Sequence, residues 1–183
     1  GKSKNYSITN NVKGILTVEK APLTVIANNL TRVYGDENPK YTLTYSGLKN
    51  GETSPEMVAA FNIATDATKT SDVGEYDIVV SGGEAKNYEI TNYTNGKLAV
   101  TKAPLTVTAK NFTKIYGSIN PEFKYSYNGA KNNDSEGAIF ETLPTISCVA
   151  DETSNVGVYE IEIGDASSNN YEILYKSGIL SVV

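Results

Sequence analysis

The 183-residue chain has no histidine and no tryptophan, and it contains only one cysteine, Cys148, and one methionine, Met57. Without histidine, the sequence excludes a Ser-His-Asp or Cys-His catalytic group and a histidine-ligated zinc or haem site. A single cysteine excludes an intrachain disulfide and a four-cysteine metal site. No apolar run approaches the ~18–20 residues that span a bilayer, so we expect no membrane insertion of this segment.

Positive charge is also scarce, with 16 Lys and Arg against 21 Asp and Glu and a net charge of −5. This balance argues against a nucleic-acid partner, which requires clustered cations to meet phosphate. The sequence contains no glycine-rich phosphate loop, and we predict no cofactor. What it does contain is 13 tyrosines, 15 glycines and many Asn, Ser and Thr residues, a composition typical of turns and pleated strands.

The sequence repeats itself at a spacing of 82 to 83 residues. Residues 20–50 and 102–132 share 17 identical positions out of 31, beginning with the same six residues, Lys-Ala-Pro-Leu-Thr-Val. The similarity is lost in the middle of the repeat and returns near its end, where Asn87-Tyr88-Glu89-Ile90 matches Asn170-Tyr171-Glu172-Ile173. A repeat of this length indicates tandem structural units.

The first eighteen residues match the end of each full repeat. Asn5-Tyr6-Ser7-Ile8 aligns with Asn87-Tyr88-Glu89-Ile90, and Gly14 through Val18 aligns with Gly96 through Val100. We expect the chain to be a piece of a longer tandem array. The predicted segments are the C-terminal hairpin of a preceding repeat at 1–18, a first full repeat domain at 19–101 and a second at 102–183.

Each repeat shows the alternation expected of β-strands. Leu23, Val25 and Ala27 are separated by single residues, and this period of two predicts a strand with one buried face. Residues 52–61 and 135–140 are less strand-like, and a short helix is possible in each. With six or seven strands in each repeat, we predict an all-β fold of two tandem immunoglobulin-like β-sandwich domains, with a β-grasp-like topology as the alternative.

Two local patterns support this prediction. The segment Ser71 to Ile78 resembles the tyrosine corner of immunoglobulin-like sandwiches, in which a Tyr follows an Asp-x-Gly turn at the start of a core strand. Ile78 and Ile161 occupy the position of the second core cysteine in that pattern. Asn95-Gly96 separates two alternating segments and predicts a hairpin turn between them.

Five motifs recur in the same order in both repeats: Lys-Ala-Pro-Leu-Thr-Val, Tyr-Gly-x-x-Asn-Pro, Ser-x-Val-Gly-x-Tyr, Asn-Tyr-x-Ile and Gly-x-Leu-x-Val. Over nearly the whole chain, this set resembles the MBG repeat family (mostly beta, glycine-rich, of the YGX type). The resemblance implies tandem units of large bacterial surface and secreted proteins, many of them adhesin-like, and it carries over no catalytic residues. The second copy departs from the first at Ser118-Ile119, which replaces Asp36-Glu37.

Calcium prefers six to eight hard oxygen ligands, and the first repeat carries several carboxylates near its turns. The second repeat replaces three of them with Ser118, Ile119 and Asn155, so we interpret them as solvated acidic turns and predict no metal site. The carboxylates considered are Asp36, Glu37, Asp66, Asp72 and Asp77.

Cys148 has no histidine to activate it, so we interpret it as a core thiol rather than a nucleophile. Most tyrosines recur at the same repeat position, which favours a core role. Tyr93, Tyr125 and Tyr175 are less regular, and they are the residues that we predict for a ligand surface if one exists.

We predict that the chain is not an enzyme but a structural spacer segment of a large bacterial extracellular surface protein. Neighbouring repeats of the same chain are its expected partners, and a semi-rigid stalk that presents another domain is its expected form, because only a few residues join the units. The alternative is an adhesin module that recognises host or dietary glycans, mucin or a matrix protein through the divergent loops at 49–72 and 131–155.

Overall fold

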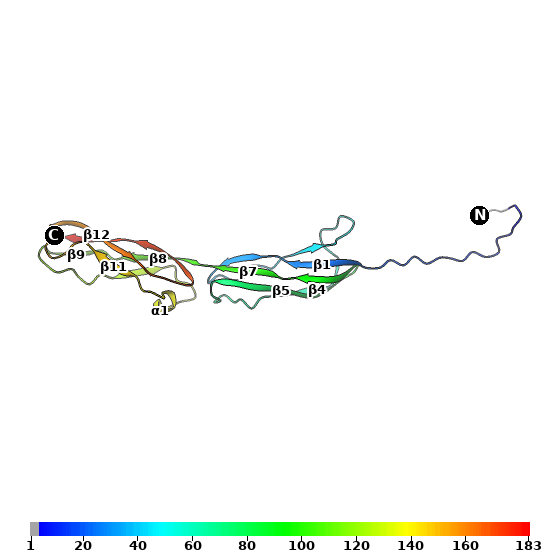
Figure 1. The fold of residues 1–183 in the computed structure, drawn as a ribbon, viewed down its shortest axis with the longest axis horizontal. Helices are drawn as coiled ribbons and strands as arrows, with labels where there is room; N and C mark the ends of the chain where they lie inside the picture. The colour runs from blue at the N-terminus through cyan, green and yellow to red at the C-terminus, as the bar shows by residue number, and fades with distance from the viewer. Residues whose placement is uncertain (1–3) are drawn as a thin grey trace.

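The computed structural model describes residues 4–183, and it is built almost entirely of β-strands. Figure 1 shows two elongated β-units placed end to end, with an extended segment leading into the first unit. One short helix, α1 (Glu136–Ile139), occurs in this part of the chain. No helix within residues 4–183 has the length and apolar character needed to cross a lipid bilayer.

Each unit contains seven strands in the same spatial order. In the first unit, a sheet of order β3-β1-β6 lies against one of order β2-β7-β5-β4, and in the second, β10-β8-β13 lies against β11-β12-β14-β9. The predicted tandem β-sandwich units are confirmed, and the β-grasp alternative is not formed. The strands are β1 (Ala21–Ala27), β2 (Leu30–Val33), β3 (Leu43–Ser46), β4 (Met57–Ala64), β5 (Gly74–Ala85), β6 (Tyr88–Thr94), β7 (Gly96–Thr101), β8 (Ala103–Ala109), β9 (Phe112–Lys114), β10 (Tyr125–Asn128), β11 (Thr145–Cys148), β12 (Gly157–Gly164), β13 (Tyr171–Lys176) and β14 (Gly178–Val182).

The core of each unit lies between its two sheets. In the first unit, Leu23 and Val25 on β1 pack against Ile78 on β5 and Leu98 on β7. Each such side chain stabilises the fold by roughly 1.5–3 kcal/mol relative to an exposed position. The alternation seen in the sequence therefore marks the inner faces of the sheets. The equivalent fully buried residues of the second unit are Leu105, Val107, Ile161 and Leu180.

The tyrosine corner is present in both units. The hydroxyl of Tyr76 donates a hydrogen bond of 2.9 Å to the backbone oxygen of Asp72, and Tyr159 makes the same 2.9 Å bond to Asn155. This bond ties the start of the core strand to the loop before it, as in immunoglobulin-like sandwiches.

Two neighbouring strands pass from one sheet to the other at the same place. β1 continues into β2 and β6 continues into β7, and the pairs β1–β6 and β2–β7 are both parallel. Gly96 lies at this crossing, where a Cβ atom would lie 2.6 Å from the backbone oxygen of Ala27. Gly178 has the same relation, at 2.7 Å, to the oxygen of Ala109 in the second unit. Glycine is required here because two backbones approach closely.

The hairpin predicted at Asn95-Gly96 is therefore wrong. β6 and β7 belong to different sheets, so the chain continues in extended form instead of reversing. β6 pairs with β1, whereas β7 pairs with β5 and β2. The Asn-Gly pair marks the crossing between sheets and not a turn.

The hairpin predicted at residues 1–18 is also not formed in the described part, and residues 1–3 lie outside it. Residues 4–20 contain no strand and are exposed, including the apolar side chains of Leu16 and Val18. The reason is that this segment matches β6 and β7, which never pair with each other and which need partner strands of their own unit. Its assignment to a preceding repeat stays a prediction.

The possible helix in residues 52–61 is wrong for the first unit, where β4 pairs with β5. Met57 and Phe61 are four residues apart and both pack against the core, and this spacing puts two side chains on the same face of a strand as well as of a helix. Val58, which a helix would place on that face too, is 63% exposed. In the second unit the short helix is confirmed as α1, which buries Ile139.

Candidate functional site: the junction between the units

The two units are joined by a single residue between strands, because β7 ends at Thr101 and β8 begins at Ala103. The residue between them, Lys102, donates from Nζ to the backbone oxygen of Ser168 at 2.7 Å. The amide of Ala103 also donates to the oxygen of Asn170 at 3.0 Å. The linker is thus held against the second unit.

Tyr34 is the centre of the contact between the units. It follows β2, and its amide donates to the oxygen of Thr101 at 2.8 Å, which aims its ring at the second unit. Its hydroxyl donates to Oδ2 of Asp134 at 2.9 Å, and the hydroxyl of Tyr171 donates to the same oxygen at 2.7 Å. The two rings are edge to face, with centroids 5.5 Å apart. The exposed fraction of Tyr34 is only 5%.

A second contact involves the loop that carries the first tyrosine corner. The side-chain amide of Asn170 donates to Oδ1 of Asp72 at 2.7 Å, and its carbonyl oxygen accepts from the amide of Val73 at 2.9 Å. One side chain on the second unit therefore satisfies both a carboxylate and a backbone donor on the first.

A third contact involves the turn after Tyr34. Lys131 Nζ lies 3.0 Å from Oδ1 of Asp36, and this partly exposed ion pair contributes at most about 1 kcal/mol. Gly35 has a φ of +80°, and a Cβ on it would lie 2.4 Å from the Cβ of Lys131. The turn needs glycine both for its left-handed backbone and for its close approach to the second unit.

These contacts raise the pKa of the two tyrosines. Burial raises the pKa of Tyr171, and the hydrogen bond to the Asp134 carboxylate raises it further. Burial is also the main cause of the raised pKa of Tyr34, with a contribution from Asp134. The junction therefore favours neutral tyrosines that donate to one carboxylate.

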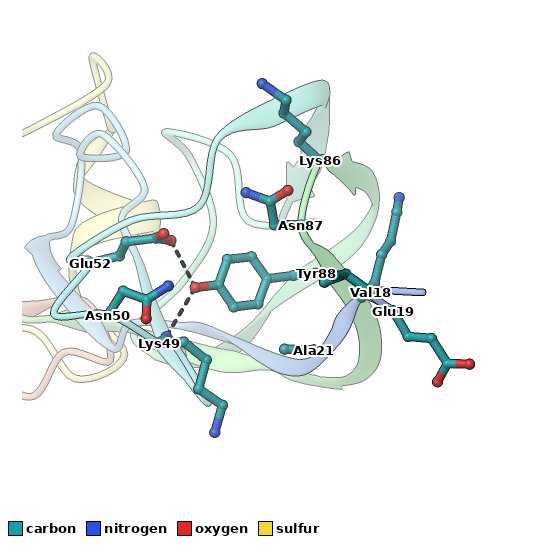
Figure 2. Close-up of a pocket in the computed structure, with 10 residues that line it drawn as sticks. Val18, Glu19, Ala21, Lys49, Asn50, Glu52, Lys86, Asn87 and Tyr88 are labelled. Carbon is teal, nitrogen blue, oxygen red and sulfur yellow. Dashed lines mark hydrogen bonds between the residues drawn. The ribbon is translucent and has the colours of Figure 1, made fainter. Parts of the chain in front are cut away.

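The first unit carries the same set of groups at its own N-terminal end. Figure 2 shows the hydroxyl of Tyr88 between Glu52 and Lys49: it donates to Oε2 of Glu52 at 2.7 Å and accepts from the amide of Lys49 at 2.9 Å. Tyr171, Asp134 and Lys131 have the same relations in the second unit. Around Tyr88 there is an open hollow of about 600 Å³, at the place that Tyr34 fills in the second unit.

The loops after residues 49 and 131 begin with the same backbone conformation. Asn50 and Asn132 both have left-handed φ values, of 56° and 52°, and the residues after them, Gly51 and Asn133, do as well. Glu52 and Asp134 follow in equivalent roles. The loops at 49–72 and 131–155, which we predicted as possible binding sites, therefore diverge only beyond Glu52 and Asp134.

The carboxylates considered for calcium do not converge. Asp36 and Asp72 contact the second unit, while Asp77 pairs with Lys97 at 2.7 Å and Glu37 pairs with Lys69 at 3.2 Å. Among residues 4–183, no three His, Cys, Asp or Glu side chains gather into a group that would hold a metal ion.

The three tyrosines predicted for a ligand surface do not form one surface, because Tyr93 belongs to the first unit and the other two to the second. Tyr93 and Tyr175 prove to be equivalent: they are in register with Val25 and Val107, and their hydroxyls donate to Gly82 and Ala166. An extra residue in β6 hides this equivalence in the sequence.

Tyr125 donates to Oε1 of Glu136 at 2.6 Å, and burial together with this bond raises its pKa to about 12. A ligand role for the three tyrosines stays a prediction. Cys148 lies on β11 with its side chain half-buried against the cluster that contains Ile161 and Leu180.

The sequence shows Tyr34 and Tyr171 only as repeated motif positions. Asp36 and Asp72 stand out only as acidic turn residues, and Asp134 does not stand out at all. Tyr34 and Asp134 are 100 positions apart, and only the fold brings them together. The available signal was the recurrence of Lys-Asn at 49–50 and 131–132, followed two residues later by an acidic residue.

Fold and junction together define a tandem all-β repeat protein whose units are docked on each other through a tyrosine-glycine turn. The MBG domain family of the YGX type matches the chain twice, at residues 23–99 and 105–181, and the chain belongs to this family. Tyr34-Gly35 and Tyr116-Gly117 lie within the two matches. Comparison with curated proteins finds no match.

Proposed function

We propose that this chain is a structural spacer segment of a bacterial extracellular surface protein, in which docked units form a semi-rigid stalk that presents another domain. The observation that carries the proposal is the pair of hydrogen bonds from Tyr34 and Tyr171 to one Asp134 oxygen. A flexible tether between independent domains would not need such a contact.

The junction restricts both bending and rotation between the units. The linker allows little motion because Lys102 alone separates two strands and is itself bonded to the second unit. Contacts through Asp72 and Asp36 attach the units at further points besides the linker and oppose rotation about it. Units that contact only their neighbours in this way behave as a quasi-one-dimensional rod.

The family membership supports the placement in a tandem array, and the resemblance stated above supports the bacterial surface. The proposed role is non-catalytic: it needs no cofactor and has neighbouring repeats as its partners. Under this proposal the hydroxyls of Tyr93, Tyr125 and Tyr175 serve the stability of their own units.

Two experiments test the proposal together. Small-angle X-ray scattering of the full chain should give a rod-like particle, and Tyr34→Ser should produce a broader and more compact ensemble. Binding to glycans, mucin and matrix proteins should be absent. Saturable binding to one of these, abolished by exchanging residues 135–155, would replace the spacer role with that of an adhesin module.

A further inference from the structure

The C-terminal end of the second unit reproduces the end of the first unit that is buried in the junction. The amide of Tyr116 donates to Val183 at 2.9 Å, as that of Tyr34 donates to Thr101. The turn bond from Ser118 to Ile115, at 3.0 Å, repeats the bond from Asp36 to Val33. The backbone of the tyrosine-glycine turn is thus the same at both ends.

The side chains of this end are exposed, in contrast to their buried equivalents. Tyr116 is 55% exposed where Tyr34 is 5% exposed. Gly117 has a φ of +81°, and nothing lies within 4 Å of the Cβ it would carry, whereas Gly35 contacts Lys131. We define the C-terminal face by its exposed apolar residues, which are Ile115, Tyr116, Ile119 and Val156.

We propose that the C-terminal face is a docking surface for the N-terminal end of another MBG unit, with the geometry of the junction inside this chain. This inference rests on the proposed role as a segment of a tandem array, and it extends that role to a surface that no contact covers within residues 4–183. The occupant is a unit that presents the groups found at Lys131, Asp134, Asn170 and Tyr171.

The chemistry of the C-terminal face fits this occupant. Tyr116 takes the place of Tyr34 and donates to the carboxylate of the incoming unit. Asn155 replaces Asp72, and its side-chain carbonyl oxygen accepts a hydrogen bond from the side-chain amide of the asparagine that corresponds to Asn170. The amide of Val156 corresponds to that of Val73, which is bonded across the existing junction.

The C-terminal face differs in charge from the equivalent face of the first unit, which is buried in the existing junction. Ser118 and Ile119 replace Asp36 and Glu37, so the ion pair to Lys131 is absent and apolar area takes its place. Contacts between such faces depend weakly on salt, because screening acts on exposed charges. The ion pair at the existing junction is partly exposed and contributes at most about 1 kcal/mol, so its absence leaves the larger part of the contact in place.

The first unit presents the complementary surface a second time. The hollow around Tyr88 is lined by Lys49, Glu52 and Asn87, the equivalents of the groups that receive Tyr34 (Figure 2). Residues 14–18, which match β7, lead into this surface. Both ends of the chain thus carry one half of the same contact.

The test is an extended chain in which a second copy of residues 102–183 follows Val183. The Val183–Lys102 bond of this chain reproduces the natural Thr101–Lys102 connection. Amide hydrogen exchange is measured at Val156 of the original second unit, in the extended and in the native chain. We expect exchange at Val156 to slow by at least about tenfold on extension, because its amide gains an acceptor and loses contact with water.

Two variants of the extended chain make the result specific. Asn170→Ala in the added copy removes the acceptor and should restore fast exchange at Val156 without altering the native units. Tyr116→Ser in the original second unit should also restore fast exchange at its Val156. Equal exchange at Val156 in the native and extended chains would overturn the inference.

The amide of Val73 separates this outcome from a failure of the proposed function. Fast exchange at Val73 in the native chain would contradict the spacer role itself. Slow exchange at Val73, together with unchanged exchange at Val156, would contradict only the docking surface.

Discussion

Tyr34 and Tyr171 come from different units, yet their hydroxyls donate to the same Asp134 oxygen while their rings meet edge to face at an interplanar angle of 78°. A single carboxylate thus links the end of one sandwich to the start of the next. Hydrogen bonds to charged acceptors contribute about 1.5–3 kcal/mol each, and an aromatic pair adds about 0.5–1.5 kcal/mol.

The hydroxyl of Tyr34 can be removed while its ring stays in place. We expect Tyr34→Phe to lower the free energy of unfolding by about 1.5 kcal/mol, measured by urea denaturation of the full chain. Tyr116→Phe is the matched control, because that hydroxyl is at the same repeat position but outside the junction. It should change stability by less than about 0.5 kcal/mol. Equal effects of the two variants would show that the bond to Asp134 is not formed.

The two tyrosine-glycine turns allow backbone strain to be separated from docking. Gly35 and Gly117 have φ values of +80° and +81°, so Ala at either position adopts a left-handed conformation at a cost of about 1 kcal/mol. Gly35→Ala also places a methyl group against Lys131. We expect it to be more destabilising than Gly117→Ala by at least about 1 kcal/mol in thermal or urea unfolding. A difference near zero would contradict the close approach.

The raised tyrosine pKa values predict a loss of stability in alkali. Tyr34 and Tyr171 ionise less readily in the folded chain, whereas an unfolded tyrosine ionises near its ordinary pKa of about 10. Their contribution is complete below about pH 10 and is lost as pH rises toward the folded-state pKa. Unfolding measured between about pH 9 and pH 11.5 should show this fall. Replacing both tyrosines with Phe should make the fall shallower, and an unchanged slope would refute the assignment.

The crossing between sheets makes its own prediction. A Cβ at position 178 would lie 2.6 Å from Lys110 O and 2.7 Å from Ala109 O, and a backbone contact cannot be relieved by a side-chain rotation. Gly178→Ala should destabilise the second unit by at least about 2 kcal/mol. Gly164→Ala is the control, because nothing lies within 4 Å of its Cβ. A neutral Gly178→Ala variant would contradict the crossing.

Much of the fold could be predicted from the sequence because the periodicity and the repeats are strong. The alternation of Leu23, Val25 and Ala27 marks buried positions correctly, and the pattern before Tyr76 predicts a tyrosine corner that forms. Both signals are local, since they depend on strand geometry and on a hydrogen bond to the residue four positions earlier.

The errors have one physical origin, which is that pairing partners are not local. Asn95-Gly96 has the composition of a hairpin turn, but the flanking strands pair with β1, β2 and β5 instead. The four-residue spacing of Met57 and Phe61 fits a helix as well as a strand, and an extra residue in β6 hides the equivalence of Tyr93 and Tyr175. The junction depends on contacts over about 100 positions, which no local pattern encodes.

The most direct test of the central claim is the distance between spin labels on the two units, placed at the exposed positions Glu75 and Glu160 in a Cys148→Ser background. If Tyr34, Asp134 and Asn170 hold the units at a fixed orientation, pulsed dipolar spectroscopy should give one narrow distance distribution. Tyr34→Ser combined with Asn170→Ala should broaden it markedly. A distribution that is already broad in the parent chain, and unchanged in the double variant, would contradict a semi-rigid spacer.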